Sequence, residues 1–388
     1  MKKALQSIVL LGAVTGVAQA ETAVQLYGIA DGGVQYKSTK VRAGNEELTK
    51  SESGIKDNNL SGSRWGLKGT EDLGNGTAVI FKLESGFSLG TGQSAQGGRL
   101  FGRQAVIGLK GDDWGTLTIG RQDNVADDFM GDFDAFGTAL DQASANSAFG
   151  DSLGYKIDAS VKYLSPEWSG FQFGLAYGGN RSHDKKSLDG KTTADDRNAD
   201  NVFSAGLKFE TGPFAIAASF DRFRVDRRTI DTTTTYSSKS WNIGTSYDFE
   251  VVKLYGLYGE VKGYNVLNTS YEYGLISNLK LSDDVLVLDA GKYRQKAWAF
   301  GLSVPVAETG KLMFSYQGVK AKDIYLGSDF GFKRKAKIFS VGYTQDLSKR
   351  TTAYASLSFG KAKAVFPNVE ARYDLKSTQA LVGLRHRF

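Results

Sequence analysis

Apolar and polar residues alternate one by one along most of this chain. The alternation is clear in several separate segments, for example Phe171, Phe173, Leu175 and Tyr177, and Trp241, Ile243, Thr245 and Tyr247. A period of two that recurs in so many segments predicts β-strands with one apolar and one polar face. The polar faces carry Ser, Gly, Gln, Thr, Lys and Asp. They are too polar for a sandwich core and suit a water-filled lumen, so we expect the apolar faces to look outward at lipid.

The alternation of apolar and polar residues is clearest in the last thirteen residues, Lys376–Phe388. One face carries Ala380, Val382, Leu384, His386 and Phe388, and the other carries Leu381, Gly383, Arg385 and Arg387. A strand with one apolar and one polar side that ends on a terminal aromatic residue fits a closed β-barrel of the bacterial outer membrane.

The connections between strands alternate between short and long. Short links include Gly111–Gly115, Thr211–Pro213 and Leu347–Arg350. The eight long polar stretches are Lys37–Ser61, Ser88–Arg99, Asp123–Gly154, Gly179–Asp200, Val225–Ser237, Asn265–Gly291, Asp323–Arg334 and Val365–Leu375. Eight long loops predict an all-β, transmembrane, antiparallel barrel of about 16 strands, with short periplasmic turns and long external loops. A barrel of that size leaves an aqueous channel.

The first twenty residues have the form of an export signal. Lys2 and Lys3 precede the apolar run Ser7–Val17, and Ala18-Gln19-Ala20 has the form of a cleavage site. The alternative, a retained membrane anchor, needs a longer apolar run. We therefore expect a signal peptide at residues 1–20 and one barrel domain at residues 21–388. Without the two lysines, 46 basic residues face 42 acidic ones, a net charge of +4, which argues against a nucleic-acid partner.

The composition excludes several kinds of chemistry. The chain has no cysteine, which removes thiolate catalysis, thiolate metal sites and disulfides. It has two histidines, His183 and His386, and no serine is paired with either, so we expect no enzyme activity. Asp132 and Asp134 have the spacing of two metal ligands, but no further carboxylate cluster surrounds them. We therefore expect no metal and no cofactor.

The third long stretch, Asp123–Gly154, has an unusual composition. It contains seven aspartates and no lysine or arginine, together with the apolar residues Phe129, Met130, Phe133, Phe136, Leu140 and Phe149. Aromatic side chains are costly to leave in water, so we expect this loop to fold into the pore, with Asp127, Asp128, Asp132 and Asp134 as its acidic face. The alternative is a solvated acidic flap or a contact between subunits.

Several segments resemble those of the Gram-negative general porins. They are Gln25–Val34, Ser63–Gly76, Leu83–Phe87, Gly102–Ala105, Gly120–Gln122, Ser160–Pro166 and Val382–Phe388. The resemblance implies a homotrimer of sixteen-stranded barrels in the outer membrane, each with a pore narrowed by the third external loop and without enzyme activity or cofactor. It also implies contact with outer-membrane lipid and lipopolysaccharide, and recognition by the barrel-assembly machinery.

The polar faces of the strands supply cations opposite the acidic loop. Arg64, Lys82 and Lys162 lie in the lumen phase of their strands, and Arg64, Arg103 and Lys162 match the family's basic constriction positions by resemblance. Arg103 shares the phase of outward residues, so a bulge or a strand-end position is needed to turn it inward. The alternative is that these are ordinary lumen charges away from the narrowing.

Two more expectations concern the chain end and the function. Phe388 is the candidate assembly signal, because it ends the lipid-facing series and the resemblance gives it that role; the alternative is an interfacial aromatic anchor. The expected function is a water-filled channel for passive diffusion of ions and small hydrophilic solutes. The alternative is a solute-specific channel for a sugar or an organic anion. A sugar channel needs a line of lumen aromatics, whereas Tyr27, Tyr258 and Tyr354 are isolated in the lumen phase.

Overall fold

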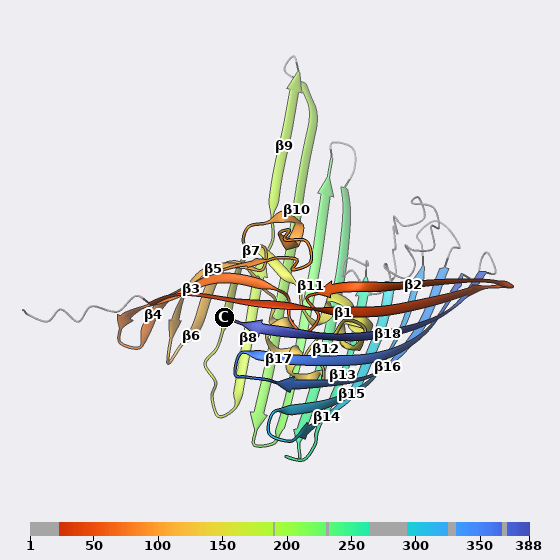
Figure 1. Ribbon diagram of the computed structural model, residues 1–388. Helices are drawn as coiled ribbons and strands as arrows, with labels where there is room; N and C mark the ends of the chain where they lie inside the picture. The colour runs from red at the N-terminus through yellow and green to blue at the C-terminus, as the bar shows by residue number, and fades with distance from the viewer. Residues whose placement is uncertain (1–22, 189–190, 230–232, 264–292, 325–330, 367–370) are drawn as a thin grey trace, which may run out of the picture.

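The computed structural model is a β-barrel with a long loop folded inside it (Figure 1). It describes residues 23–188, 191–229, 233–263, 293–324, 331–366 and 371–388. The predicted export signal, residues 1–20, and the predicted loop Asn265–Gly291 lie outside these residues, and both stay predictions.

Eighteen strand segments make up the sheet in the described residues. They are β1 (Ala23–Ala43), β2 (Glu46–Asp57), β3 (Arg64–Gly74), β4 (Thr77–Gly86), β5 (Gln104–Gly111), β6 (Gly115–Asp123), β7 (Lys156–Leu164), β8 (Phe171–Gly178), β9 (Arg181–Leu188), β10 (Lys191–Thr211), β11 (Phe214–Arg228), β12 (Thr233–Asp248), β13 (Lys253–Gly263), β14 (Tyr293–Val306), β15 (Gly310–Ile324), β16 (Gly331–Asp346), β17 (Thr351–Phe366) and β18 (Ala371–Arg387).

These segments occupy sixteen positions around the barrel. β2 and β3 both pair with β1, at Gly32–Ala43 and at Ala23–Ile29, and are two parts of one wall strand. β8 and β9 share β10 in the same way. All the pairings are antiparallel, and β18 pairs with β1 from Ile29 to Ala43, which closes the ring. Closure leaves no open edge within the wall, as a bilayer requires. The predicted sixteen-stranded barrel is confirmed.

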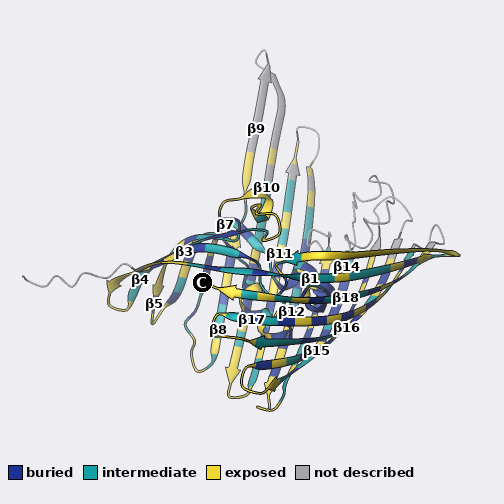
Figure 2. Ribbon diagram, in the orientation of Figure 1, coloured by how far each residue is buried: buried dark blue, intermediate teal, exposed yellow. Residues whose placement is uncertain are grey.

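Side chains alternate between the two faces of the wall as the sequence pattern predicts. Exposed apolar residues such as Leu175, Leu207, Ile243 and Phe300 form the outer face, and their neighbours along each strand are buried or half-buried (Figure 2). Tyr258 is a correction. It is exposed and lies beside Trp241 on the outer face, whereas Leu257 points inward and is buried. Both phases of β13 carry apolar residues, so alternation could not separate them.

Several stretches expected to be loops are strands. β1 and β2 fill most of Lys37–Ser61, β9 and β10 fill most of Gly179–Asp200, and similar extensions lengthen the β11–β12, β15–β16 and β17–β18 hairpins. The residues there are polar because these hairpins project beyond the barrel (Figure 1). A strand outside lipid has no need of an apolar face, so these segments carry no alternation to detect.

Candidate functional site: the third loop and the lumen wall

The third loop is built from short helical turns packed against the inside of the barrel. They are α2 (Val125–Met130), η1 (Gly131–Phe133), η2 (Asp141–Ala143), α3 (Asn146–Phe149) and η3 (Gly150–Leu153); α1 (Ala95–Gly98) lies in the preceding loop. α2 contacts β8 and β10 to β12, α3 contacts β14 and β15, and η2 contacts β16 and β17. The loop therefore covers one side of the lumen, which confirms the prediction that it folds into the barrel.

The start of the loop is fixed by hydrogen bonds to the wall. Asn124 caps α2 by accepting from the backbone N–H of Asp127, and its amide donates to Asp221 of β11 at 3.0 Å. The Tyr155 hydroxyl donates to the same Asp221 oxygen at 3.0 Å. The backbone N–H of Val125 donates to Ser204 of β10. These buried bonds hold the start of the loop against β10 and β11, and its end against β11.

Apolar side chains of the loop fit onto glycines of the inner wall. A Cβ atom added to Gly244 would lie 2.6 Å from the Phe133 ring, and one added to Gly342 would lie 2.6 Å from the Phe136 ring. Gly206 and Gly301 leave the same kind of space for Val125 and Ala135. Any side chain at these positions would push the loop off the wall. Burying the loop's aromatic rings there removes them from lumen water.

Three buried glutamines of the wall bind the loop backbone. Gln295 of β14 donates to the carbonyl oxygens of Ala148 and Phe149. Gln317 of β15 donates to the Gln142, Ala143 and Ser144 carbonyl oxygens, at 2.9 Å for Ser144. Gln379 of β18 accepts from the Gln142 backbone N–H. Short loop turns expose backbone groups that need partners, and these side chains supply them.

The tip of the loop is bound to the break between β2 and β3. The backbone N–H of Leu140 donates to the Asn59 carbonyl oxygen at 2.7 Å, and Lys56 pairs with Asp141. Burial alone would raise the pKa of Asp141, but Lys56 lowers it on balance. Asp31 of β1 holds the break in place by accepting from the N–H groups of Asn59, Leu60 and Ser61.

The four candidate aspartates of the loop have four different environments. Asp128 pairs with Lys162 at 2.7 Å, and Asp132 pairs with Lys208 at 3.0 Å. Asp134 is buried and accepts from three backbone N–H groups of its own loop, those of Phe136, Thr138 and Ala145. Burial raises the pKa of Asp128 and of Asp134. For Asp127, burial and then repulsion from Asp123 raise the pKa to about 6.

Three of the four candidate basic residues meet around one carboxylate, Glu84 of β4. Arg103 donates to Glu84 at 2.7 Å, Lys82 lies at 3.5 Å and Arg64 at 3.6 Å. The Tyr27 hydroxyl donates to the same carboxylate at 2.8 Å. Arg103 directly precedes β5, and this strand-end position turns its side chain inward. We call Arg64, Lys82, Arg103 and Glu84 the Glu84 cluster.

Lys162 lies apart from this cluster. It is buried against the base of the loop, where it also donates to the Asp123 carbonyl oxygen at 3.0 Å. Among the described residues, the cations of the Glu84 cluster make no ion pair with the third loop. The cluster lies on β3 to β5, whereas the loop covers β8 to β17. Around the ring, the two therefore occupy different sides of the lumen.

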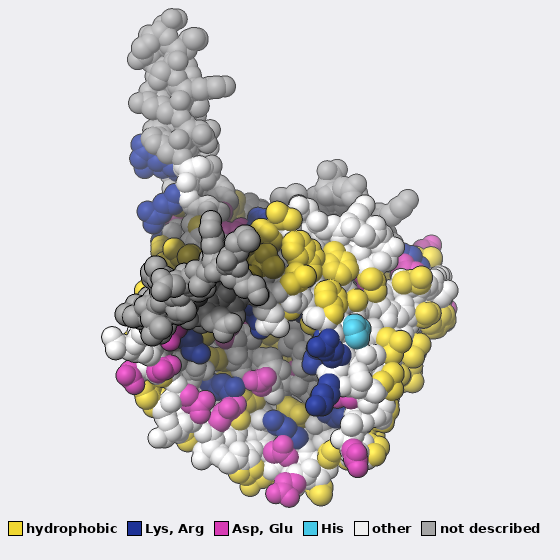
Figure 3. All heavy atoms as spheres, turned by 60° about the vertical axis from the view of Figure 1, so that its left-hand side comes forward, with side chains coloured by type: hydrophobic (Ala, Val, Ile, Leu, Met, Phe, Trp, Pro, Cys, Tyr) yellow, Lys and Arg dark blue, Asp and Glu magenta, His cyan; other side chains and the backbone are white. Residues whose placement is uncertain are grey.

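Several charged residues of the lumen were missed by the sequence analysis. Asp158 of β7 binds Arg99 through two contacts of 2.9 Å and also pairs with Arg121. Lys156 pairs with Asp123, and Lys208 bridges Asp132 and Glu210. Lys156, Asp158 and Lys208 lie in the lumen phase of their strands, and that phase is the signal in the sequence that indicates them. Figure 3 shows basic and acidic side chains gathered around the hollowed face of the barrel.

Neither a metal site nor a spanning helix is found in the part of the chain that the structure describes. It holds no group of three or more His, Cys, Asp or Glu residues placed to bind a metal ion. Its helices are all too short or too polar to cross a membrane.

Phe388 lies where the barrel closes. Its backbone exchanges two hydrogen bonds with Gly28 of β1, at 2.9 and 3.0 Å. A Cβ atom added to Gly28 would lie 2.3 Å from the Phe388 ring. The ring itself remains exposed on the outside. The assembly role of Phe388 stays a prediction.

Comparisons with known proteins agree with this architecture. The family model for Gram-negative porins matches residues 7–364. An outer membrane porin of Bordetella pertussis is 39% identical over the whole of both chains, and outer membrane porin protein 32 of Delftia acidovorans is 28% identical over the whole of both.

Solved structures share the fold. An anion-selective porin from Comamonas acidovorans has a TM-score of 0.66 at 22% identity, covering 95% of this chain and all of that one. OmpT of Vibrio cholerae, in a trimer form, has a TM-score of 0.54 at 14% identity, covering 95% of this chain and 99% of that one. A closed sixteen-stranded barrel with an inner loop and a charged lumen, matched over nearly its whole length by outer-membrane porins, is a channel for passive diffusion of ions and small hydrophilic solutes, and the chain belongs to the Gram-negative porin family.

Proposed function

We propose that the narrow part of this channel runs between the third loop and the Glu84 cluster, and that it favours anions over cations. The observation that carries the proposal is the charge balance of the two sides. On the wall, Arg64, Lys82 and Arg103 surround the single carboxylate of Glu84, which leaves two uncompensated positive charges.

On the acidic side, several carboxylates of the loop pair with lysines of the wall. Lys162 pairs with Asp128, Lys208 is shared by Asp132 and Glu210, and three backbone N–H groups donate hydrogen bonds to Asp134. Asp127 lies near both Lys156 and Lys162. A lumen lined by an excess of one charge concentrates the opposite ion, so the wall should set the sign of the selectivity. The fold shared with the Comamonas acidovorans porin, which is anion-selective, supports this sign.

The zero-current potential of the purified protein in a planar bilayer tests the proposal. In a KCl gradient, the wild-type potential should have the sign of chloride preference. The double variant Arg64→Gln, Lys82→Gln should move it toward potassium. A matched control, Lys349→Gln with Arg350→Gln, removes the same charge from the short β16–β17 turn and should leave it nearly unchanged. Potassium preference in the wild type would contradict the proposal.

We further propose that the protein assembles as a homotrimer without enzyme activity, held in the outer membrane by contacts with lipid and lipopolysaccharide after insertion by the barrel-assembly machinery. The trimer form of Vibrio cholerae OmpT, which has the same fold, supports the trimer. The exposed apolar outer face supports contact with lipid. Light scattering in detergent should give three times the monomer mass; a monomer mass would contradict the trimer.

A further inference from the structure

A row of aromatic residues crosses the outer face of the barrel on four neighbouring strands. Phe300 of β14, Tyr316 of β15, Phe339 of β16 and Phe359 of β17 lie opposite one another from strand to strand, and all four are exposed. These strands lie side by side in the wall (Figure 1). Aromatic rings on the outer face of a membrane barrel lie at the boundary between hydrocarbon and headgroups. We call these four residues the aromatic row.

Lysines follow the aromatic row on the same face, toward the long loops. Lys337 of β16, Lys361 of β17 and Lys376 of β18 lie opposite one another, and the first two lie two residues beyond the aromatic row. The next row, on β14 to β17, consists of Lys296, Lys320, Lys335 and Lys363. We call these seven residues the outer lysine rows. All seven are exposed.

Within these rows, lysine lies directly opposite lysine. Lys335, for example, is paired across the ladder with Lys320 on one side and with Lys363 on the other. Opposed side chains of an antiparallel pair have Cβ atoms about 5 Å apart, so like charges at such positions destabilise the sheet. The ammonium of Lys337 lies 5.9 Å from the centre of the Tyr316 ring, which connects the lysines to the aromatic row.

The carboxylates at the two ends of the rows are already paired with other cations. Glu260, opposite Lys296 in the ladder, pairs with Arg294, and Asp374 lies 3.1 Å from Arg372. Asp374 also lies 3.8 Å from Lys363. Among the described residues, the other six lysines of the rows make no ion pair within 4.0 Å. The repulsion between them therefore favours an anion from outside the chain.

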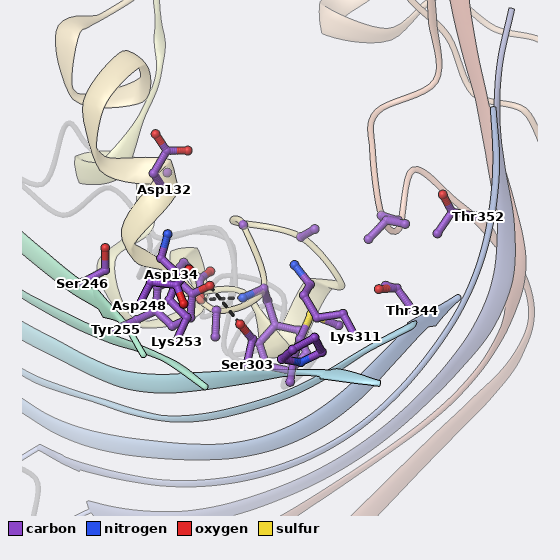
Figure 4. Close-up of a pocket in the computed structure, with 18 of the residues that line it drawn as sticks. Asp132, Asp134, Ser246, Asp248, Lys253, Tyr255, Ser303, Lys311, Thr344 and Thr352 are labelled. Carbon is purple, nitrogen blue, oxygen red and sulfur yellow. Dashed lines mark hydrogen bonds between the residues drawn. The ribbon is translucent and has the colours of Figure 1, made fainter. Parts of the chain in front are cut away.

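Cations inside the barrel have a different environment. In the cavity beneath the third loop, Lys253 and Lys311 lie among carboxylates that include Asp132, Asp134 and Asp248 (Figure 4). Asp134 is close enough to Lys311 for its charge to act on that ammonium. Acidic and basic side chains are thus mixed in the lumen, whereas basic side chains alone make up the outer lysine rows.

We propose that the outer lysine rows bind the phosphorylated headgroup of a lipid whose acyl chains lie against the aromatic row. Ammonium groups bind phosphate oxygens through charge-assisted hydrogen bonds. Two residues of a strand span about 7 Å, so one lipid reaches both surfaces, whereas a soluble anion has no use for the aromatic row. The site rests on the proposed contact with lipopolysaccharide, the phosphorylated lipid of the outer leaflet, and assigns that contact to β14–β18.

The test is the binding of lipid A with two phosphates to the purified protein in detergent, measured by microscale thermophoresis. The triple variant Lys320→Gln, Lys335→Gln, Lys337→Gln should raise the dissociation constant at least tenfold, because each lysine near an anionic headgroup adds about fivefold in affinity. The control Lys110→Gln, Lys349→Gln, Arg350→Gln removes the same charge from residues at the short turns and should leave the constant nearly unchanged.

Two further probes separate the lipid from its parts. Phosphatidylcholine, which has acyl chains but no net charge, should bind the wild type much more weakly than lipid A does. Inositol hexakisphosphate, a soluble polyphosphate, should compete poorly with lipid A, because it cannot use the aromatic row. If this soluble probe binds as tightly as lipid A, the surface takes polyanions in general and the assignment to a lipid is wrong.

The outcomes also separate this site from the broader proposals. Equal lipid A affinity in the wild type and the triple variant would overturn the site and leave the contact with lipopolysaccharide to other surfaces. Equal affinity of the wild type for lipid A and phosphatidylcholine would contradict that contact itself. The zero-current potential should be the same in the triple variant, because the rows face away from the lumen. If the triple variant does not assemble, Lys335→Arg should keep the affinity and Lys335→Gln should lower it.

Discussion

The exchange Glu84→Gln should increase the preference of the pore for anions. Glu84 is the one carboxylate among Arg64, Lys82 and Arg103, so its neutralisation raises the net charge of the cluster from +2 to +3. Glutamine keeps the length of the side chain, and its carbonyl oxygen can still accept from Arg103 or Tyr27. The change is therefore mainly one of charge.

The size of the effect follows from the distance between the cluster and a passing ion. Across about 8 Å of water, one unit charge interacts with another by about 0.5 kcal/mol, and salt at about 0.1 M reduces this to about 0.2 kcal/mol. An anion gains this energy and a cation loses it, so the ratio of anion to cation permeability should rise about twofold. At about 1 M salt the Debye length is about 3 Å, and the ratio should change by no more than about a tenth.

The assay is the zero-current potential in KCl gradients at low and at high mean salt. Glu167→Gln is the matched control, because Glu167 is exposed in the short β7–β8 turn and its loss removes the same charge. Heat-sensitive migration on gels checks that both variants are folded. An unchanged ratio at low salt, or the same shift in the control, would refute the reasoning that the Glu84 cluster lies on the permeation path.

Four further outcomes are expected. The closed barrel should remain folded in detergent and migrate differently before and after heating; a helical circular dichroism spectrum would contradict the fold. Deletion of Phe388 should lower the amount of protein assembled in the outer membrane without affecting export, and unchanged assembly would count against its role. Asp134→Asn replaces one of the two acceptor oxygens by an NH2 donor, so at least one of the three backbone N–H groups loses its acceptor. This change should weaken the loop turn by about 1–3 kcal/mol and make the loop more sensitive to chymotrypsin than Asp132→Asn does. Burial raises the pKa of Asp151, in η3 of the third loop, to about 6, the same value as for Asp127. Lowering the pH from 7 to 5 therefore protonates both carboxylates, removes negative charge from the loop and should increase anion preference; a full response in the variant Asp127→Asn, Asp151→Asn would exclude them as its source.

The barrel itself could be predicted from the sequence because the polarity of each strand residue matches the medium, lipid or water, that its side chain faces. Lipid on one side and water on the other force an alternation of apolar and polar residues, as in Leu207 and Phe209 with Lys208 between them. The same relation explains the one incorrect prediction of a side-chain direction, that of Tyr258. The sequence pattern wrongly predicts a lumen position for Tyr258, because β13 meets the apolar loop on its inner face and so carries apolar residues on both faces.

The candidate site was harder to predict, because the effect of a charged side chain on the pore depends on the groups that it pairs with. Its position in the sequence does not show those partners. Lys162 and Asp134 have the residue types that a pore lining requires. Lys162 is buried against Asp128, however, and Asp134 is buried within its own loop. The sequence alone does not indicate the role of Glu84, because its three cations come from β3, β4 and the residue before β5, and only the register of the strands brings them together.

The sequence nevertheless contained a signal for the position of the loop. Gly206, Gly244, Gly301 and Gly342 all lie in the lumen phase of alternate strands, β10, β12, β14 and β16, where an ordinary water-facing position would tolerate a side chain. Glycine costs conformational entropy in a strand, so its repeated use on one face indicates that something must approach closely. The buried glutamines on β14, β15 and β18 mark the same surface as one that binds backbone. An apolar, acidic loop without cations has a complementary partner in such a wall. Because the loop is held there at so many points, we expect it to be a fixed element that sets the size of the pore, while the proposed selectivity comes from the charges of the opposite wall.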